Sequence, residues 1–128
     1  MPDDNKFFPT KFSGYYVSRT GEVFRDPIKR DHTNQPVKVL THLRGGAYTK
    51  QYSSVNISLK ENGKFHKQIR YYVHRLVGET LLENPHNLTE INHKDGDKLN
   101  NSVTNLEWVT KAQNFSHKAQ RRQSGRFV

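Results

Sequence analysis

The sequence predicts an α+β fold with an N-terminal mostly-β region, one connecting helix, and a C-terminal unit of two short strands and a helix. Alternating apolar residues surround the Asn62-Gly63 pair, a strong hairpin signal. From Val73 the apolar spacing changes to that of a helix. Residues 91–118 then combine two short apolar runs with a second helical pattern. The 128 residues divide into a flexible N-terminus (1–13), a β-rich region (14–72), a helix with the C-terminal unit (73–120) and a basic tail (121–128).

The β-rich region is expected to contain two hairpins. Residues 15–17 and 22–24 flank a Ser-Arg-Thr-Gly turn and predict the first. Prolines and charged residues make 25–36 a loop, and 37–43 read as a single strand. Residues 54–61 and 64–72 alternate in polarity around Asn62-Gly63 and predict the second hairpin.

Two helices are expected in the second half of the chain. The first covers 73–83 and should end at Asn84-Pro85, with its apolar stripe packed against the sheet and the C-terminal unit. The second covers 110–120, where Thr110 and Gln113 form a capping-box pattern. The stripe of the first helix consists of Val73, Leu76, Val77, Thr80 and Leu81.

Composition points to a polyanionic partner. The net charge is +9, the isoelectric point about 9.9 and the mean hydropathy −0.96, which favours nucleic acid. The absence of cysteine excludes disulfides and a cysteine-ligated zinc. The sequence has neither a long apolar run nor a secretory leader pattern, so a cytoplasmic location is expected, with no membrane partner.

The charge is unevenly distributed along the chain. Residues 1–78 sum to +8, residues 79–107 to −4, and residues 108–128 to +5. We expect the basic parts to contact phosphates, and the acidic, turn-rich stretch to belong to a cation-binding unit.

Chemistry-bearing residues concentrate between Ile91 and Lys118. His93 follows a short apolar run, and Asn114 and His117 lie on the predicted last helix. A histidine at a strand end, facing an amide or imidazole on a helix, suits metal-assisted phosphodiester hydrolysis.

This segment resembles the HNH motif of the ββα-metal nucleases, in the version found in phage and intron homing endonucleases. His93 matches the first histidine, Asn105 the central asparagine, and Asn114 the helix position. Residues 14–24 resemble a small module that precedes the motif in such enzymes. The resemblance implies a C-terminal ββα-metal (HNH) motif and a DNA endonuclease that hydrolyses phosphodiester bonds with Mg²⁺ or Mn²⁺.

The resemblance also assigns roles to the motif residues. His93 would be the general base and Asn114 a metal ligand. Asn92 stands where many members have aspartate, so it is either a second ligand or a residue that shapes the strand end. Asn105, grouped with the catalytic residues, would mainly hold the loop and His93 in place. His117 is a further ligand, a phosphate contact, a transition-state donor or an ordinary surface histidine.

Double-stranded DNA is the expected substrate, contacted by the upstream sheet and the C-terminal tail. Arg75 is a candidate clamp for the scissile phosphate. One motif gives one active site, so a monomer would nick one strand and a homodimer would cut both. The neutral Asn92 keeps open the alternative of a non-catalytic nucleic-acid-binding protein with a degenerate motif. The predicted DNA contacts are Arg19, Arg25, Lys64, Lys67, Arg70, Arg75, Lys118, Arg121 and Arg122.

Overall fold

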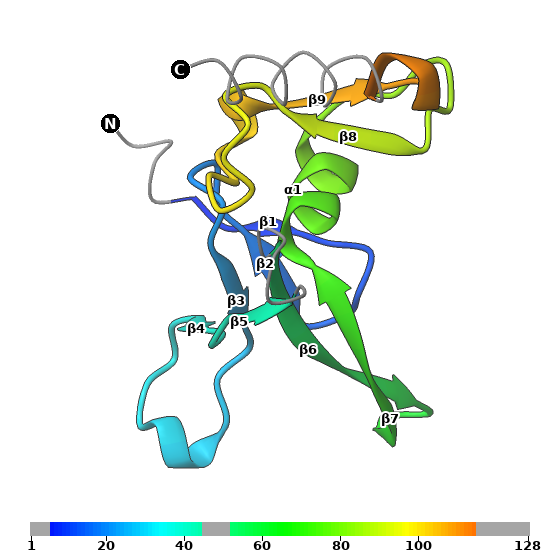
Figure 1. Ribbon diagram of the computed structural model, residues 1–128. Coiled ribbons are helices and arrows are strands. Elements are labelled where there is room, and N and C mark those ends of the chain that lie inside the picture. The colour runs from blue at the N-terminus through cyan, green and yellow to red at the C-terminus, as the bar shows by residue number, and fades with distance from the viewer. Residues whose placement is uncertain (1–5, 45–51, 115–128) are drawn as a thin grey trace.

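The computed structural model describes residues 6–44 and 52–114, which form three small antiparallel sheets and one central helix (Figure 1). The first sheet has the order β1-β2-β3-β4 and the second the order β5-β6-β7, while β8 and β9 form a separate pair. The mixed α+β class predicted from the sequence is confirmed, with most described elements being strands. The strands of the first sheet are β1 (Phe8–Pro9), β2 (Tyr15–Val17), β3 (Val23–Arg25) and β4 (Val37–Lys38).

Two details of the N-terminal half differ from expectation. The predicted flexible terminus contains β1, because Phe8 pairs with Val17 of β2 and packs against the core. The single strand expected at 37–43 is divided between two sheets. Its first part is β4, paired with β3, and its second part belongs to β5 (His42–Arg44), paired with β6. A short 3-10 helix, Lys29–Asp31, lies within the expected loop.

The second hairpin matches its prediction. Strands β6 (Tyr52–Glu61) and β7 (Lys64–Tyr72) pair from Ser54 opposite Tyr72 to Glu61 opposite Lys64, with one register shift at Leu59/Lys60. Asn62 and Gly63 have φ values of 55° and 78°, as a two-residue turn of the type favoured in hairpins requires.

Helix α1 (Val73–Leu81) lies between the β8–β9 pair and the other two sheets (Figure 1). Its buried stripe, Val73, Leu76 and Val77, joins the core cluster that strands β2, β3 and β6 also line. The helix ends two residues before the predicted Glu83. Gly78 permits a close approach to β8, because a Cβ there would stand 2.6 Å from Ile91 Cδ1.

Strands β8 (Glu90–His93) and β9 (Leu106–Val109) are joined by a long loop that ends in a 3-10 turn, Val103–Asn105. The predicted capping box then begins a helical turn at 111–114. Gln113 N donates to Thr110 Oγ1 at 3.1 Å, and Thr110 N donates to Gln113 Oε1 at 2.9 Å. The remainder of the predicted last helix lies outside the described residues. Within the described ranges, no helix is long and apolar enough to cross a membrane.

Candidate active site

His93 ends β8 as a buried side chain with a defined orientation. Its Nε2 lies 2.8 Å from the Oδ1 of Asn101, and the residue is 5% exposed. An amide oxygen can accept but not donate, so Nε2 carries the hydrogen and Nδ1 keeps the lone pair. Asn101 therefore leaves Nδ1 as the nitrogen that can take a proton from water.

The surroundings of His93 keep it neutral. Burial lowers its pKa, against the opposing effects of the Asn101 hydrogen bond and the nearby carboxylates of Asp95 and Asp97. The His74 ring stands 5.0 Å from the His93 ring and the Tyr52 ring 6.1 Å, centroid to centroid. A neutral imidazole near physiological pH is the form that a general base requires.

Asn105 holds the loop that precedes β9. Its Nδ2 donates to Asp95 Oδ1 at 3.0 Å and to Asn100 O at 2.9 Å, and its Oδ1 accepts from Asp95 N at 3.1 Å. Its backbone oxygen accepts from Lys94 N at 2.8 Å, directly after His93. These are the contacts of a residue that positions the loop, and the side chain is not among those that line the His93 pocket.

The turn of the first hairpin supports the same loop. Gly21 has a φ of 92°, and a Cβ there would stand 2.6 Å from the backbone carbon and oxygen of Asn101. Val103 N donates to Arg19 O at 2.9 Å, and Ser102 Oγ donates to Thr20 O at 3.4 Å. The turn of the first hairpin therefore packs directly against the loop residue that orients His93.

A small pocket brings His93 together with both expected metal ligands, Asn92 and Asn114. Asn92 Nδ2 donates to Glu107 Oε2 at 2.9 Å, and Asn114 Nδ2 donates to Glu90 Oε1 at 3.5 Å. Because a carboxylate only accepts, the shorter contact fixes which side of the Asn92 amide carries nitrogen, and the longer one favours the corresponding orientation of Asn114. Each amide oxygen is thereby directed away from its glutamate.

The donor set of this pocket fits a hard divalent cation. Amide oxygens are suitable ligands for Mg²⁺ and Mn²⁺, which retain waters and bind substrate phosphates as well. Among the described residues, no group of three or more His, Asp or Glu side chains could hold a metal. Of the sequence-predicted ligands, Asn92 and Asn114 both line this pocket.

Three residues at the site received no role from the sequence. Asn101 belongs to the Asn100-Asn101 pair, which is part of the resemblance to the HNH motif. The pair alone does not indicate that Asn101 contacts His93. Tyr52 lines the pocket, and no sequence pattern gave it a role there. Lys98 also lines the pocket, with Nζ 4.5 Å from the centre of the Tyr52 ring, and no sequence pattern marks it.

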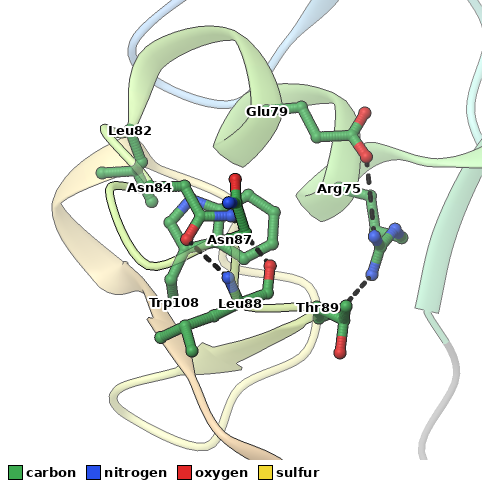
Figure 2. A pocket seen from close by; sticks show the side chains of 8 residues that line it. All are labelled: Arg75, Glu79, Leu82, Asn84, Asn87, Leu88, Thr89 and Trp108. Atoms are coloured by element: carbon green, nitrogen blue, oxygen red, sulfur yellow. Dashed lines mark hydrogen bonds and ion pairs between the residues drawn. The ribbon is translucent and has the colours of Figure 1, made fainter.

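Arg75 lies in a second pocket and not beside His93. Figure 2 shows its guanidinium between Glu79 and Thr89. Nη1 donates to Thr89 O at 2.9 Å, and Nη2 is 3.5 Å from Glu79 Oε2. Successive helical residues point in different directions, so the neighbouring His74 has other surroundings than Arg75 and packs on His93. The expectation that Arg75 clamps the scissile phosphate is therefore not supported by its position. The lining of this pocket is completed by Leu82, Asn84, Asn87, Leu88 and Trp108.

The other predicted DNA contacts have different surroundings. Lys64, Lys67 and Arg70 are exposed along β7. Arg25 forms two hydrogen bonds to Asp31, at 2.9 and 3.2 Å, so its guanidinium is already paired. The exposed Arg19 lies over the Phe8 ring at 5.2 Å. Outside the described residues lie His117, Lys118, Arg121 and Arg122.

Comparison with known proteins places this geometry in a family. Residues 71–115 match the family model described as HNH endonuclease. The chain is 34% identical over 122 residues to the uncharacterized HNH endonuclease L245 of Acanthamoeba polyphaga mimivirus, covering 89% of this chain and 32% of that protein. It is 32% identical over 111 residues to DNA endonuclease I-HmuI of Bacillus phage SP01, covering 86% of this chain and 55% of that one.

A solved structure of I-HmuI, titled as DNA binding and cleavage by this HNH homing endonuclease, is also similar. The match has a TM-score of 0.65 at 29% identity and covers 91% of this chain and 59% of that chain. This chain thus spans between a third and three fifths of the lengths of these relatives. The family match includes β8, β9 and every lining residue of the His93 pocket except Tyr52, and the likeness to homing endonucleases extends over most of the chain. The protein therefore carries an HNH endonuclease domain of the homing-endonuclease type.

Proposed function

We propose that this protein is a divalent-metal-dependent endonuclease that hydrolyses phosphodiester bonds in double-stranded DNA. The observation that supports this most directly is the His93 pocket. It combines a buried neutral imidazole, oriented by Asn101, with two amides whose nitrogens are held by glutamates. General-base catalysis of this kind contributes roughly 10²- to 10⁴-fold in rate.

In the proposed reaction, His93 Nδ1 takes a proton from the water that attacks phosphorus, the bond between phosphorus and the leaving oxygen breaks, and the leaving oxygen takes a proton from a solvent water. Asn92 and Asn114 would hold Mg²⁺ or Mn²⁺ through their oxygens. The bound cation would stabilise charge on the phosphoryl and leaving oxygens. Asn105 and Asn101 keep the loop and the imidazole in place while the proton moves.

The DNA is proposed to lie against exposed cations of the β6–β7 hairpin, a two-stranded ribbon of a size that fits the major groove. Lys64, Lys67 and Arg70 follow one strand of this hairpin. A single pocket of this kind cuts one strand, so a monomer would nick DNA and a homodimer would cut both strands. Such an enzyme would act in the cytoplasm, where the host DNA of a phage is found.

Cleavage of supercoiled plasmid with Mg²⁺, with Mn²⁺ and with EDTA tests this proposal. We expect open-circular product with either metal and none with EDTA. Binding of the same DNA is measured in parallel by mobility shift across a salt series, because phosphate contacts weaken as salt rises. Binding that is tight, salt-sensitive and equal with and without metal, on several DNAs that remain uncut, would favour the non-catalytic binder instead.

A further inference from the structure

We infer that Glu107 is a positioning residue for the metal centre, orienting Asn92 and supplying the negative charge that the two amide ligands lack. This inference rests on the proposed function, since it concerns the affinity of the same pocket for a divalent cation. It assigns to Glu107 a role that no sequence pattern indicated.

The contact between Asn92 and Glu107 is built into the strand pair. The two residues are direct partners in the β8–β9 register, so their side chains lie on the same face. Asn92 is 4% exposed, and its Nδ2 donates to Glu107 Oε2 at 2.9 Å. A buried amide with this partner cannot turn over without placing its oxygen against a carboxylate oxygen. Glu107 therefore selects the orientation in which the Asn92 oxygen is available to a cation.

The same contact adds charge where the ligands have none. Neutral amides alone bind divalent cations weakly, whereas a carboxylate one hydrogen bond away contributes an electrostatic attraction and polarises the amide toward its oxygen. The other carboxylates near the pocket are less well placed for this. Asp95 accepts hydrogen bonds from Asn100, Asn105 and Asp97, and Asp97 accepts one from Leu99.

Glu90 makes the corresponding contact to Asn114, but at 3.5 Å. A hydrogen bond of this length is weak, so its effect on metal affinity should be smaller. The structure thus ranks the two glutamates, with Glu107 first.

The test is a Mn²⁺ titration of the full chain without DNA, followed by the paramagnetic broadening of the Asn92 and Asn114 side-chain NH₂ signals in NMR spectra. Glu107→Gln should raise the Mn²⁺ concentration needed for half-broadening by about 10-fold or more, since partners of metal ligands typically contribute 10- to 100-fold in affinity. Glu90→Gln should raise it less. Glu83→Gln is the matched control, because it removes the same charge from an exposed position beyond α1.

A coupled substitution separates this role from a general loss of negative charge. In an Asn92→Asp background, Glu107 would face a carboxylate instead of an amide, and two adjacent carboxylates repel. Glu107→Gln should then leave Mn²⁺ affinity unchanged or improve it, the reverse of its effect in the natural chain. The backbone spectrum of each variant shows whether the fold is retained.

Half-broadening of the natural chain and of Glu107→Gln at the same Mn²⁺ concentration would overturn the inference and leave the proposed nuclease intact. An equal loss of affinity in both backgrounds would overturn the orienting role of Glu107, since an effect of its charge alone does not depend on residue 92. Failure of the natural chain to bind Mn²⁺ at these asparagines would overturn the metal centre itself, and the inference with it.

Discussion

Two neighbouring residues of α1 lie beside two pockets of opposite character. His74 packs on His93, which lines one pocket together with Asn92 and Asn114, while Arg75 lines the other pocket with Glu79 and Thr89. In the second pocket the charged groups satisfy one another, as expected of groups that stabilise a surface. In the first, supporting residues hold one side of each functional group and leave the other side for a substrate or cation. This difference supports the proposal that phosphodiester cleavage takes place at the His93 pocket.

The largest effect is expected from Gly21→Ala, which disturbs the His93 pocket from outside. The new Cβ would meet the Asn101 backbone at 2.6 Å, at a φ of 92° that L-residues rarely adopt. We expect a loss of roughly 3 kcal/mol in the free energy of unfolding, from backbone strain plus overpacking. Urea denaturation measures this loss.

Gly63→Ala is the matched control for that change. Gly63 also has a positive φ, 78°, but a Cβ there would meet nothing within 4 Å. Its loss should be about 1–2 kcal/mol, from backbone strain alone. Equal losses in the two variants would show that the contact between the first hairpin and the Asn101 loop does not matter for stability.

Asn101→Ala removes the hydrogen bond to His93 Nε2 without changing the His93 side chain itself. A histidine that is no longer held in one orientation should cleave plasmid about 10- to 100-fold more slowly, by analogy with supporting residues of other catalytic centres. DNA affinity should not change, because Asn101 is buried. Cleavage at the natural rate would show that His93 needs no such support.

His74 gives the His93 pocket a pH-dependent stability. Burial lowers the pKa of His74 to about 3, and its Nδ1 has no hydrogen-bond partner within the described residues. The unfolded chain, with an ordinary histidine pKa near 6.5, therefore binds a proton first as the pH falls. The contribution of neutral His74 to the free energy of unfolding is fully present above about pH 6.5 and decreases steadily from there toward pH 3.

His74→Phe keeps an aromatic ring among Tyr52, Tyr72 and His93 but cannot titrate. Between pH 7 and pH 5 the natural chain should lose about 2 kcal/mol more than the variant. Urea denaturation at the two pH values measures the difference. Parallel losses in both proteins would mean that His74 is protonated in the folded state without a penalty.

The smallest effect is expected from Arg75→Ala. Its ion pair with Glu79 is partly exposed and 3.5 Å long, so its removal should change stability by less than about 1 kcal/mol. Plasmid cleavage should stay within a few-fold of the natural rate, because Arg75 lies outside the His93 pocket. A hundred-fold loss of cleavage with intact folding would support Arg75 as a phosphate clamp. It would also show that the Arg75 pocket takes part in cleavage.

Local patterns predicted the parts of the fold that depend on neighbours in sequence. The Asn62-Gly63 turn predicted the β6–β7 hairpin, helical spacing predicted α1, and the capping box predicted the start of the last helix. Strand β1 and the division of residues 37–43 were missed. These strands have only two or three residues each, which is too short for an alternating pattern to show.

In the candidate site, too, some features are visible in the sequence and others appear only in the structure. The order of His93, Asn105 and Asn114 is visible in the sequence, and the structure brings His93 and Asn114 into one pocket. The contact of Glu107 follows from strand register, that of Asn101 from the path of the loop between β8 and β9, and the orientation of Arg75 from helix rotation. A shift of one residue in the β8–β9 register would separate Asn92 from Glu107.

The role of His93 as general base is tested by the plasmid cleavage rate of His93→Ala beside its DNA affinity. We expect a rate at least 10²-fold below that of the natural chain in Mg²⁺, with unchanged affinity, because the variant loses the base and keeps the basic surface. A rate within a few-fold of the natural chain, in a folded and DNA-bound variant, would contradict the assignment of chemistry to this pocket.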